Sequence, residues 1–181
     1  VFGGKLKKAD ADKVAKLLCV VKVVPLETAV AVVAEKSWWF AHQALKELPI
    51  EWDLGANTKV SSASIMEFLR EGVTVKDAPV SRHEGDVEKA FASAAKTVEA
   101  EYYAPYLEHA TMEPQNCTVL FKNDRIDIWA PSQNSEATAA TAASTAEIPV
   151  TNVEVHKVHL GGGFGRRGLH IDFVREGVQI A

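Results

Sequence analysis

The pattern of apolar and polar positions in the first third of the chain predicts a small mixed unit of helices and strands. Val20–Pro25 and Ala29–Ala34 are valine-rich runs separated by a short connection, which is typical of two buried strands joined by a tight turn. Ser37 is suited to cap a helix that Pro49 would end. The expected elements are, in order, a helix at 9–18, strands at 20–25 and 29–34, a helix at 37–48 and a strand at 50–53.

The middle of the chain is rich in turn-forming residues. Residues 53–57 and 77–86 are polar and interrupted by Gly or Pro, and the amphipathic stretch Ser61–Arg70 lies between them. We therefore place a domain boundary near residue 79. Beyond it we expect a helix at 86–96, begun by an aspartate cap, and an extended segment at 97–104.

The last third of the chain predicts a hairpin, a helix, a strand and a final helix. Asn116–Phe121 and Arg125–Ala130 flank Lys122-Asn123-Asp124, which is a suitable hairpin turn. The other expected elements are an alanine-rich helix at 135–146, a strand at 153–160 and a helix that begins at about His170. The predicted strand leads directly into the glycine-rich segment Gly161–Arg167. The fold class expected from these elements is α+β.

Composition and charge exclude several classes of protein. The 181 residues are 47% hydrophobic and 24% charged, which is enough to build a core, and the net charge of −4 argues against a nucleic-acid surface. No apolar stretch approaches the roughly 20 residues of a membrane helix, so no membrane span is expected. Cys19 and Cys117 are too far apart for a paired metal-binding spacing, and we expect both to be small buried residues. The four tryptophans, Trp38, Trp39, Trp52 and Trp129, are expected to be packing residues.

The segment Gly161-Gly162-Gly163-Phe164-Gly165-Arg166-Arg167 lies between a predicted strand and a predicted helix. Glycines allow backbone N–H groups to approach a ligand, a helix N-terminus favours an anion, and two arginines add donors suited to phosphate. A dinucleotide-binding loop would need a further strand and an acidic residue that the chain does not supply, and no Gly-Lys-Ser/Thr follows for a Walker loop. An anion-binding loop and a merely tight turn remain as alternatives.

Three motifs carry a family resemblance when they are taken in order. They are Tyr106–Asn116, Trp129–Asn134 and Gly161–Arg167, and together they resemble the molybdenum-binding large subunit of the xanthine dehydrogenase and aldehyde oxidase family, most closely its isoquinoline 1-oxidoreductase beta subunits. Residues 1 to about 53 also resemble the later part of the family's α/β hammerhead domain. The resemblance implies that residues 1–78 are a partial hammerhead domain and linker. Residues 79–181 would then be the first part of the molybdopterin-binding domain.

The resemblance also assigns roles to individual residues. The family hydroxylates an aldehyde or an N-heterocycle with oxygen from water, and Gln133 matches the glutamine whose amide hydrogen-bonds an oxo ligand of the molybdenum. Phe164 matches the aromatic residue on the substrate side of the metal. The residues expected to contact the cofactor are Gly161, Gly162, Gly163, Phe164, Gly165 and Arg166, and no protein ligand of the metal is expected. Gly168 stands where xanthine-oxidising members have a glutamate, which argues against a purine substrate.

The polar residues Glu108, His109 and Glu113 have acid–base potential, but we expect His109 to be a structural hydrogen-bonding residue. The family's catalytic glutamate and its other cofactor loops would follow Ala181, and its iron–sulfur clusters belong to a small subunit or an N-terminal domain. The complete protein is expected to carry molybdopterin in the cytosine dinucleotide form.

The absence of an initial Met and of a terminator after the last helix suggests a fragment. We expect it to be inactive alone, to bind no cofactor, and to expose apolar surface that favours self-association. The compartment, cytoplasm or periplasm, stays open. A different interpretation is a separate, non-catalytic binding or assembly module with an anion-binding loop.

Overall fold

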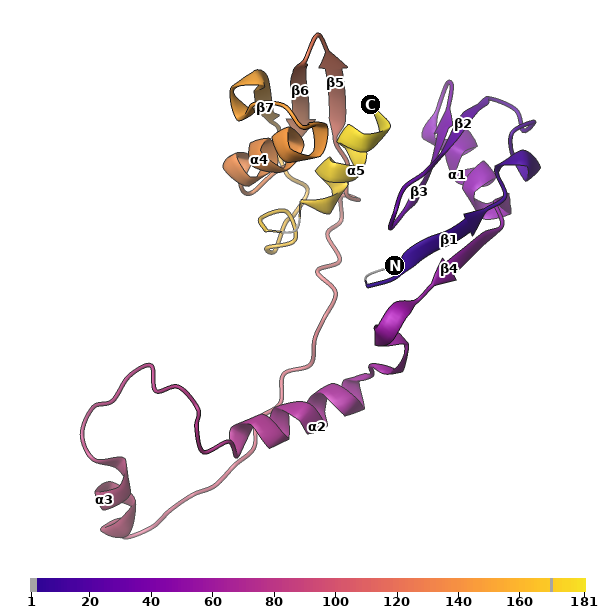
Figure 1. Cartoon of the computed structure of the whole chain (residues 1–181). Helices are drawn as coiled ribbons and strands as arrows, with labels where there is room; N and C mark the ends of the chain where they lie inside the picture. Colours follow the sequence, from indigo (N-terminus) through magenta and orange to yellow (C-terminus); the bar gives the residue numbers. More distant parts are fainter. Residues whose placement is uncertain (1–2, 170) are drawn as a thin grey trace. The chain divides into compact units, whose positions relative to one another are not determined.

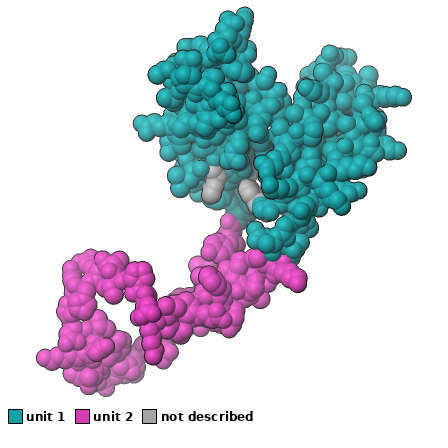
Figure 2. Space-filling model, in the orientation of Figure 1, with its two compact units in different colours: residues 1–58, 108–181 teal, residues 59–107 magenta. Residues whose placement is uncertain are grey.

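A computed structural model describes residues 3–169 and 171–181 of the chain. Residues 1 and 2, and His170, the expected start of the last helix, lie outside the described residues. Contacts between residues divide the chain into two units, residues 1–58 with 108–181 and residues 59–107 (Figure 2).

Residues 3–58 form two small antiparallel sheets and one long helix (Figure 1). Their elements are β1 (Lys5–Ala9), η1 (Ala11–Lys13), β2 (Val20–Pro25), β3 (Val30–Ala34), α1 (Trp38–Glu47), β4 (Ile50–Asp53) and η2 (Gly55–Lys59). Strand β1 pairs with β4, and β2 pairs with β3. The predicted strands at 20–25, 29–34 and 50–53 and the helix after Ser37 are therefore confirmed. Val14, Ala44 and Leu48 are the buried residues of their shared core.

The predicted helix at 9–18 is wrong. The segment forms the short 3-10 helix η1 and further tight turns, with bonds such as those from Val14 N to Ala11 O and from Leu17 N to Val14 O. Cys19 then adopts a left-handed backbone with φ of 66°, and Leu18 is 74% exposed. In this segment Val14 is the buried residue of the core, and the half-buried Leu17 packs against the same cluster. The preceding strand β1 was not predicted, because three of its five residues are lysines and its two apolar residues, Leu6 and Ala9, do not alternate.

The prediction for the tryptophans is wrong at three positions, and at one of them, Trp129, the side chain is 38% exposed and stacks on His156. Trp38 and Trp39 are 73% and 57% exposed at the start of α1, and Trp38 stacks on His42 instead of entering the core. Both cysteines are free and half-buried, so neither is as deeply packed as we expected.

Residues 59–107 contain α2 (Ser62–Val73) and α3 (Val87–Ala92). Ser61 caps α2 in a reciprocal pair with Ser64, and the Asp86 side chain accepts the hydrogen bond from Lys89 N that begins α3. The helix predicted at 86–96 ends earlier than expected, at Ala92, and residues 97–104, predicted as an extended segment, belong to no helix or sheet. Only Ile65 and Met66 are even half-buried here. The segment builds no core of its own, and it exposes large apolar side chains such as Phe68 and Val73.

Residues 108–181 form a three-stranded sheet with two helices on one face (Figure 1). The elements are β5 (Thr118–Lys122), β6 (Arg125–Ala130), α4 (Ser135–Ala146), η3 (Val150–Asn152), β7 (Val153–Lys157) and α5 (Asp172–Ile180). The predicted hairpin, alanine-rich helix and final helix are confirmed, whereas the predicted strand at 153–160 ends at Lys157. In the hairpin turn, Asn123 and Asp124 both have positive φ, which Asn and Asp tolerate better than most residues.

The core of this part lies between the sheet and its two helices. The inward residues of β6 are Ile126, Ile128 and Ala130, and they pack against Val174 and Val178 of α5. Helix α4 is rich in small residues, and its Ala142 is fully buried in the same cluster. Among the described residues, no helix combines the length and the apolar character that crossing a membrane requires.

The pairing of the strands places three segments at one edge of the sheet. Strand β7 runs parallel to β6, with Ala130 opposite Lys157, so both strands end at this edge. Strand β5 is antiparallel to β6, with Thr118 opposite Trp129, so it begins there. The crossover through α4 is what permits the parallel pair. The residues before β5, after β6 and after β7 therefore become neighbours.

Candidate functional site

The three motifs found in the sequence meet at this edge of the sheet. Residues 108–117 precede β5, residues 131–134 follow β6, and the glycine-rich loop Gly161–Arg167 follows β7. Carboxyl ends of parallel strands are the usual place for a ligand site in open sheets. The geometry therefore brings together side chains that are as far apart in sequence as Glu113 and Arg167.

The loop begins at a close contact between Gly161 and Glu113. Gly161 N donates to the Glu113 carboxylate over 3.0 Å, and Glu113 N donates to Gly161 O over 3.2 Å. A Cβ on Gly161 would lie 2.5 Å from Glu113 Cβ, so only glycine fits. The hydrogen bond from Gly161 N, with further contributions from the Asn116 side chain and Arg167, lowers the pKa of Glu113 below its ordinary value. This carboxylate is therefore ionised, and its hydrogen bonds are made to groups of the protein itself.

Gln133 lies against the centre of the loop. Its backbone N–H donates to Arg167 O over 3.1 Å, and its side-chain oxygen accepts from Gly165 N over 3.0 Å. Because a backbone N–H can only donate, the oxygen of the amide must face Gly165, and the NH2 group must face the other way. A Cβ on Gly163 would lie 2.4 Å from Gln133 Oε1. The glycine at 163 therefore makes room for the oriented amide.

The residues on either side of Gln133 are anchored at the start of α4. The Ser132 and Thr138 hydroxyls lie 2.9 Å apart, and both side chains are buried. The Asn134 side chain caps α4 by accepting from Ala137 N over 3.0 Å. These contacts fix the backbone on which Gln133 stands.

Arg167 is fully buried behind the loop. Its guanidinium donates to the carbonyl oxygens of Gly162 (3.1 Å), Pro131 (3.4 Å), Glu113 (2.8 Å) and Pro114 (3.3 Å). It also forms an ion pair of 3.1 Å with the Glu113 carboxylate. The expectation that both arginines provide donors for a phosphate is therefore wrong for Arg167, because its nitrogens are committed to the protein.

Arg166 lies on the other side of the loop and pairs with the first turn of α5. Its two terminal nitrogens donate to the two carboxylate oxygens of Asp172 over 2.9 and 2.8 Å. Burial raises the pKa of Asp172, but the hydrogen bonds and charge of Arg166 outweigh it and the net pKa is lowered. The pair joins the loop to α5, and a direct contact between Arg166 and a cofactor stays a prediction.

Phe164 is the most prominent side chain of the loop. It is 77% exposed and has a φ of 51°, which is unusual for a residue other than glycine. Within the part of the chain that the structure describes, the backbone N–H groups of Gly162, Gly163 and Phe164 donate to no protein acceptor. Three successive donors of this kind, with the amide NH2 of Gln133, suit a ligand rich in acceptor atoms.

Glu108 and His109 do not share the bonding of Glu113. Both are exposed, although His109 Nε2 lies 3.9 Å from where a Cβ on Gly165 would be. Sequence reasoning missed that Glu113 and Arg167 bind each other. The available signal was an acidic residue in the first motif and a second, consecutive arginine in the third. In the described ranges, no group of three His, Cys, Asp or Glu side chains could hold a metal.

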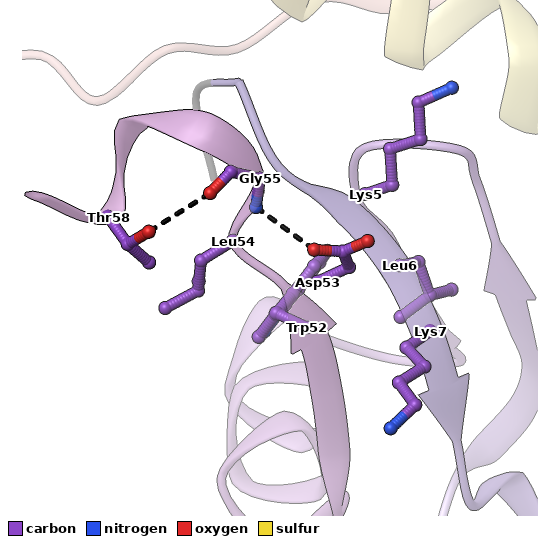
Figure 3. Close-up of a pocket in the computed structure, with 8 residues that line it drawn as sticks. All are labelled: Lys5, Leu6, Lys7, Trp52, Asp53, Leu54, Gly55 and Thr58. Carbon is purple, nitrogen blue, oxygen red and sulfur yellow. Dashed lines mark hydrogen bonds between the residues drawn. The ribbon is translucent and has the colours of Figure 1, made fainter.

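A separate surface hollow lies where β1 begins and β4 ends (Figure 3). Its polar atoms are satisfied locally, since Asp53 accepts from Gly55 N over 3.0 Å and the Thr58 hydroxyl donates to Gly55 O over 3.0 Å. Lys5 pairs with Glu27 over 2.7 Å. The hollow therefore offers a ligand much less than the loop does.

Comparison with known proteins identifies the family of the chain. A sequence model described as the molybdopterin cofactor-binding domain matches residues 72–174. The chain is 29% identical over 174 residues to the membrane-bound aldehyde dehydrogenase [pyrroloquinoline-quinone] of Gluconacetobacter polyoxogenes, covering 92% of the chain and 22% of that relative. It is 32% identical over 90 residues to the aldehyde oxidoreductase molybdenum-binding subunit PaoC of Escherichia coli K12, covering 50% of the chain and 12% of that relative.

The fold is also found in a solved structure. Quinoline 2-oxidoreductase from Pseudomonas putida 86 is similar with a TM-score of 0.65 and 20% identity, over 94% of this chain and 27% of that one. This likeness supports the α+β fold that the sequence predicted. The chain thus spans about a quarter or less of the length of these proteins.

Proposed function

Because the chain belongs to the molybdopterin cofactor-binding domain family, we propose that it is part of the large subunit of a molybdenum hydroxylase. The reaction would oxidise an aldehyde or an N-heterocycle with oxygen from water. The observation that carries the proposal is the convergence of Gln133 and the loop Gly161–Arg167 on one exposed surface with unused donors.

The residues present fit a molybdopterin. Its phosphate and oxygen atoms are acceptors, and the loop offers the N–H groups of Gly162, Gly163 and Phe164. The glycines keep side chains away from this backbone. Gly161, Gly165 and Arg166 would complete the contacts, with Arg166 held by Asp172 at the margin of the site. When bound, the cofactor supplies the redox centre that takes electrons from the substrate carbon.

Gln133 and Phe164 have the most direct roles in this proposal. The NH2 group of Gln133, turned away from Gly165, would donate to an oxygen on the cofactor and remain neutral at every working pH. The exposed ring of Phe164 would stack on a flat substrate and orient its reacting carbon. Gly168 leaves no carboxylate at the end of the loop, which favours an aldehyde or an N-heterocycle over a purine.

The proposal extends to the organisation of the complete protein. Residues 1–78 would be the later part of a hammerhead domain with its linker, and residues 79–181 the first part of the cofactor domain. The cofactor would be the cytosine dinucleotide form, and electrons would pass to an iron–sulfur partner. The exposed apolar side chains of residues 59–107 support contacts with further protein, including self-association of this chain when it is isolated.

Metal and pterin analysis of the complete gene product, purified with its neighbours, tests the proposal. We expect molybdenum close to one atom per large subunit, a cytosine nucleotide on hydrolysis of the pterin, and label from 18O-water in the oxidised product. A reading frame that stops after Ala181 and a product without molybdenum would instead support a separate binding module.

A further inference from the structure

Arg167 is a charged side chain that is fully buried yet has every nitrogen engaged. Its Nε donates to Gly162 O inside the loop, and Nη1 donates to Pro131 O after β6. Its Nη2 reaches the Glu113 and Pro114 carbonyl oxygens before β5. One side chain therefore contacts all three segments that form the site.

Glu113 completes the connection from the opposite side. Its carboxylate lies 3.1 Å from Arg167 Nη2 and also accepts from Gly161 N over 3.0 Å. The ends of the loop are thus tied together, with Gly161 held by Glu113 and the loop's last residue held by the same carboxylate. The ring of Phe173, 6.0 Å from the guanidinium carbon, lies beside the charge.

We propose that the pair formed by the buried Arg167 and the half-buried Glu113 is the positioning device of the glycine-rich loop, and this inference rests on the proposed function only for its effect on cofactor binding. Arg167 has no exposed surface with which to touch a ligand, so it acts through the backbone of Gly161 and Gly162. It fixes where the free N–H groups point, and its own carbonyl holds the backbone of Gln133.

A stabilising ion pair alone would not need this geometry. A pair between a buried arginine and a partly exposed carboxylate contributes little to stability, because desolvation of the arginine and solvent screening of the carboxylate offset the attraction. A planar fork with donors along two edges is needed to join carbonyl groups of three segments at once, and lysine cannot provide it. The pair is therefore better explained by the placement of the loop than by stability.

Hydrogen exchange in the cofactor-free protein tests the proposal without relying on the proposed function. Arg167→Met and Arg167→Lys should each speed exchange of the Gly161 and Gly165 amides by about tenfold or more, because bonds to charged groups hold this region. The amides of Ile126 and Ile128 in β6 should keep their rates. Arg175→Met, at an exposed arginine of α5, is the matched control and should change neither set.

The double variant Arg167→Met/Glu113→Gln separates positioning from stability. Because this double variant leaves no charge unpaired, its free energy of unfolding should recover part of what Arg167→Met loses. Its Gly165 amide should still exchange fast. The proposal would be overturned if the loop amides of Arg167→Lys exchange at unchanged rates, or if the exchange rate rises equally at every amide. If Arg167→Met does not fold, Arg167→Lys decides. If the exchange rates change as expected but the complete protein contains no molybdenum, only the proposed function is rejected.

Discussion

Gly163→Ala offers a sharp test of the assignment of Gln133. The added Cβ would lie 2.4 Å from Gln133 Oε1 and 2.6 Å from its Cδ, whereas ordinary contacts are 3.4–4 Å. The backbone at Gly163 does not have a positive φ, so alanine is acceptable there apart from this clash. The Gln133 side chain must therefore rotate away and give up its 3.0 Å bond from Gly165 N.

The expected magnitude follows from what the rotation removes. The bond to Gly165 is worth about 0.5–1.5 kcal/mol, and an oriented donor to a reacting group about 2.7–4 kcal/mol of barrier, which is a hundredfold to a thousandfold in rate. Gly163→Ala should thus lower turnover per bound molybdenum about as much as Gln133→Ala. In the double variant Gly163→Ala/Gln133→Ala the added methyl group has no amide side chain to displace. The losses of turnover in the two single variants should therefore be far from additive.

Turnover and molybdenum content of the complete enzyme should be measured for the two single variants and the double variant. Gln133→Glu keeps an acceptor for Gly165 but no donor, so it should be as slow as Gln133→Ala. Gly72→Ala is the control, because nothing lies within 4 Å of the Cβ it adds. Full turnover per molybdenum in Gly163→Ala, or strictly additive losses, would refute the reasoning.

Three further predictions concern the loop and its support. Gly161→Ala should lower cofactor content more than turnover per molybdenum, because its Cβ would lie 2.5 Å from Glu113 Cβ and displace the loop; unchanged metal content would contradict this. The lowered pKa of Glu113 should stabilise the fold at pH values above the ordinary pKa of glutamate, and this stabilisation should be lost as the pH falls through the lowered pKa. In a plot of the free energy of unfolding against pH, Glu113→Gln should therefore make the decline at acid pH less steep. An equally steep decline would count against the pair. Asn134→Ala should reduce the free energy of unfolding by about 1 kcal/mol through loss of the α4 cap, with Glu136→Ala as a neighbouring control, and equal unfolding midpoints would argue against the cap.

Sequence patterns correctly predicted the elements that are stabilised by interactions between residues close together in the chain. The hairpin follows from turn chemistry, since Asn123 and Asp124 occupy the left-handed positions that such turns require. The helix at 135–146 was predicted from its alanine content, and the structure adds that Asn134 caps it. The error at 9–18 has the opposite origin, because apolar spacing cannot distinguish a helix from successive tight turns when only Val14 is buried.

The bonding of the site could not be predicted from patterns. Sequence reasoning considered both Arg166 and Arg167 as donors for a phosphate, although it expected only Arg166 to contact the cofactor. In the structure Arg166 pairs with Asp172 near the surface, and Arg167 is buried. The two arginine side chains point in opposite directions because of how the loop turns, and the spacing of residues in the sequence does not specify that turn. Glu113 was considered for acid–base chemistry, and only the pairing of β5 with β6 places it against Gly161.

The parallel pairing of β6 with β7 determines when during folding this site can exist. The β5–β6 hairpin closes through two turn residues and can form early, whereas β7 must wait for residues 131–152 to cross over the sheet. The loop after β7 reaches Glu113 and Gln133 only once that slower, non-local step is complete. A chain caught before it would have its hairpin formed and its glycine-rich loop still unassembled, so under the proposed function cofactor insertion would follow the docking of β7.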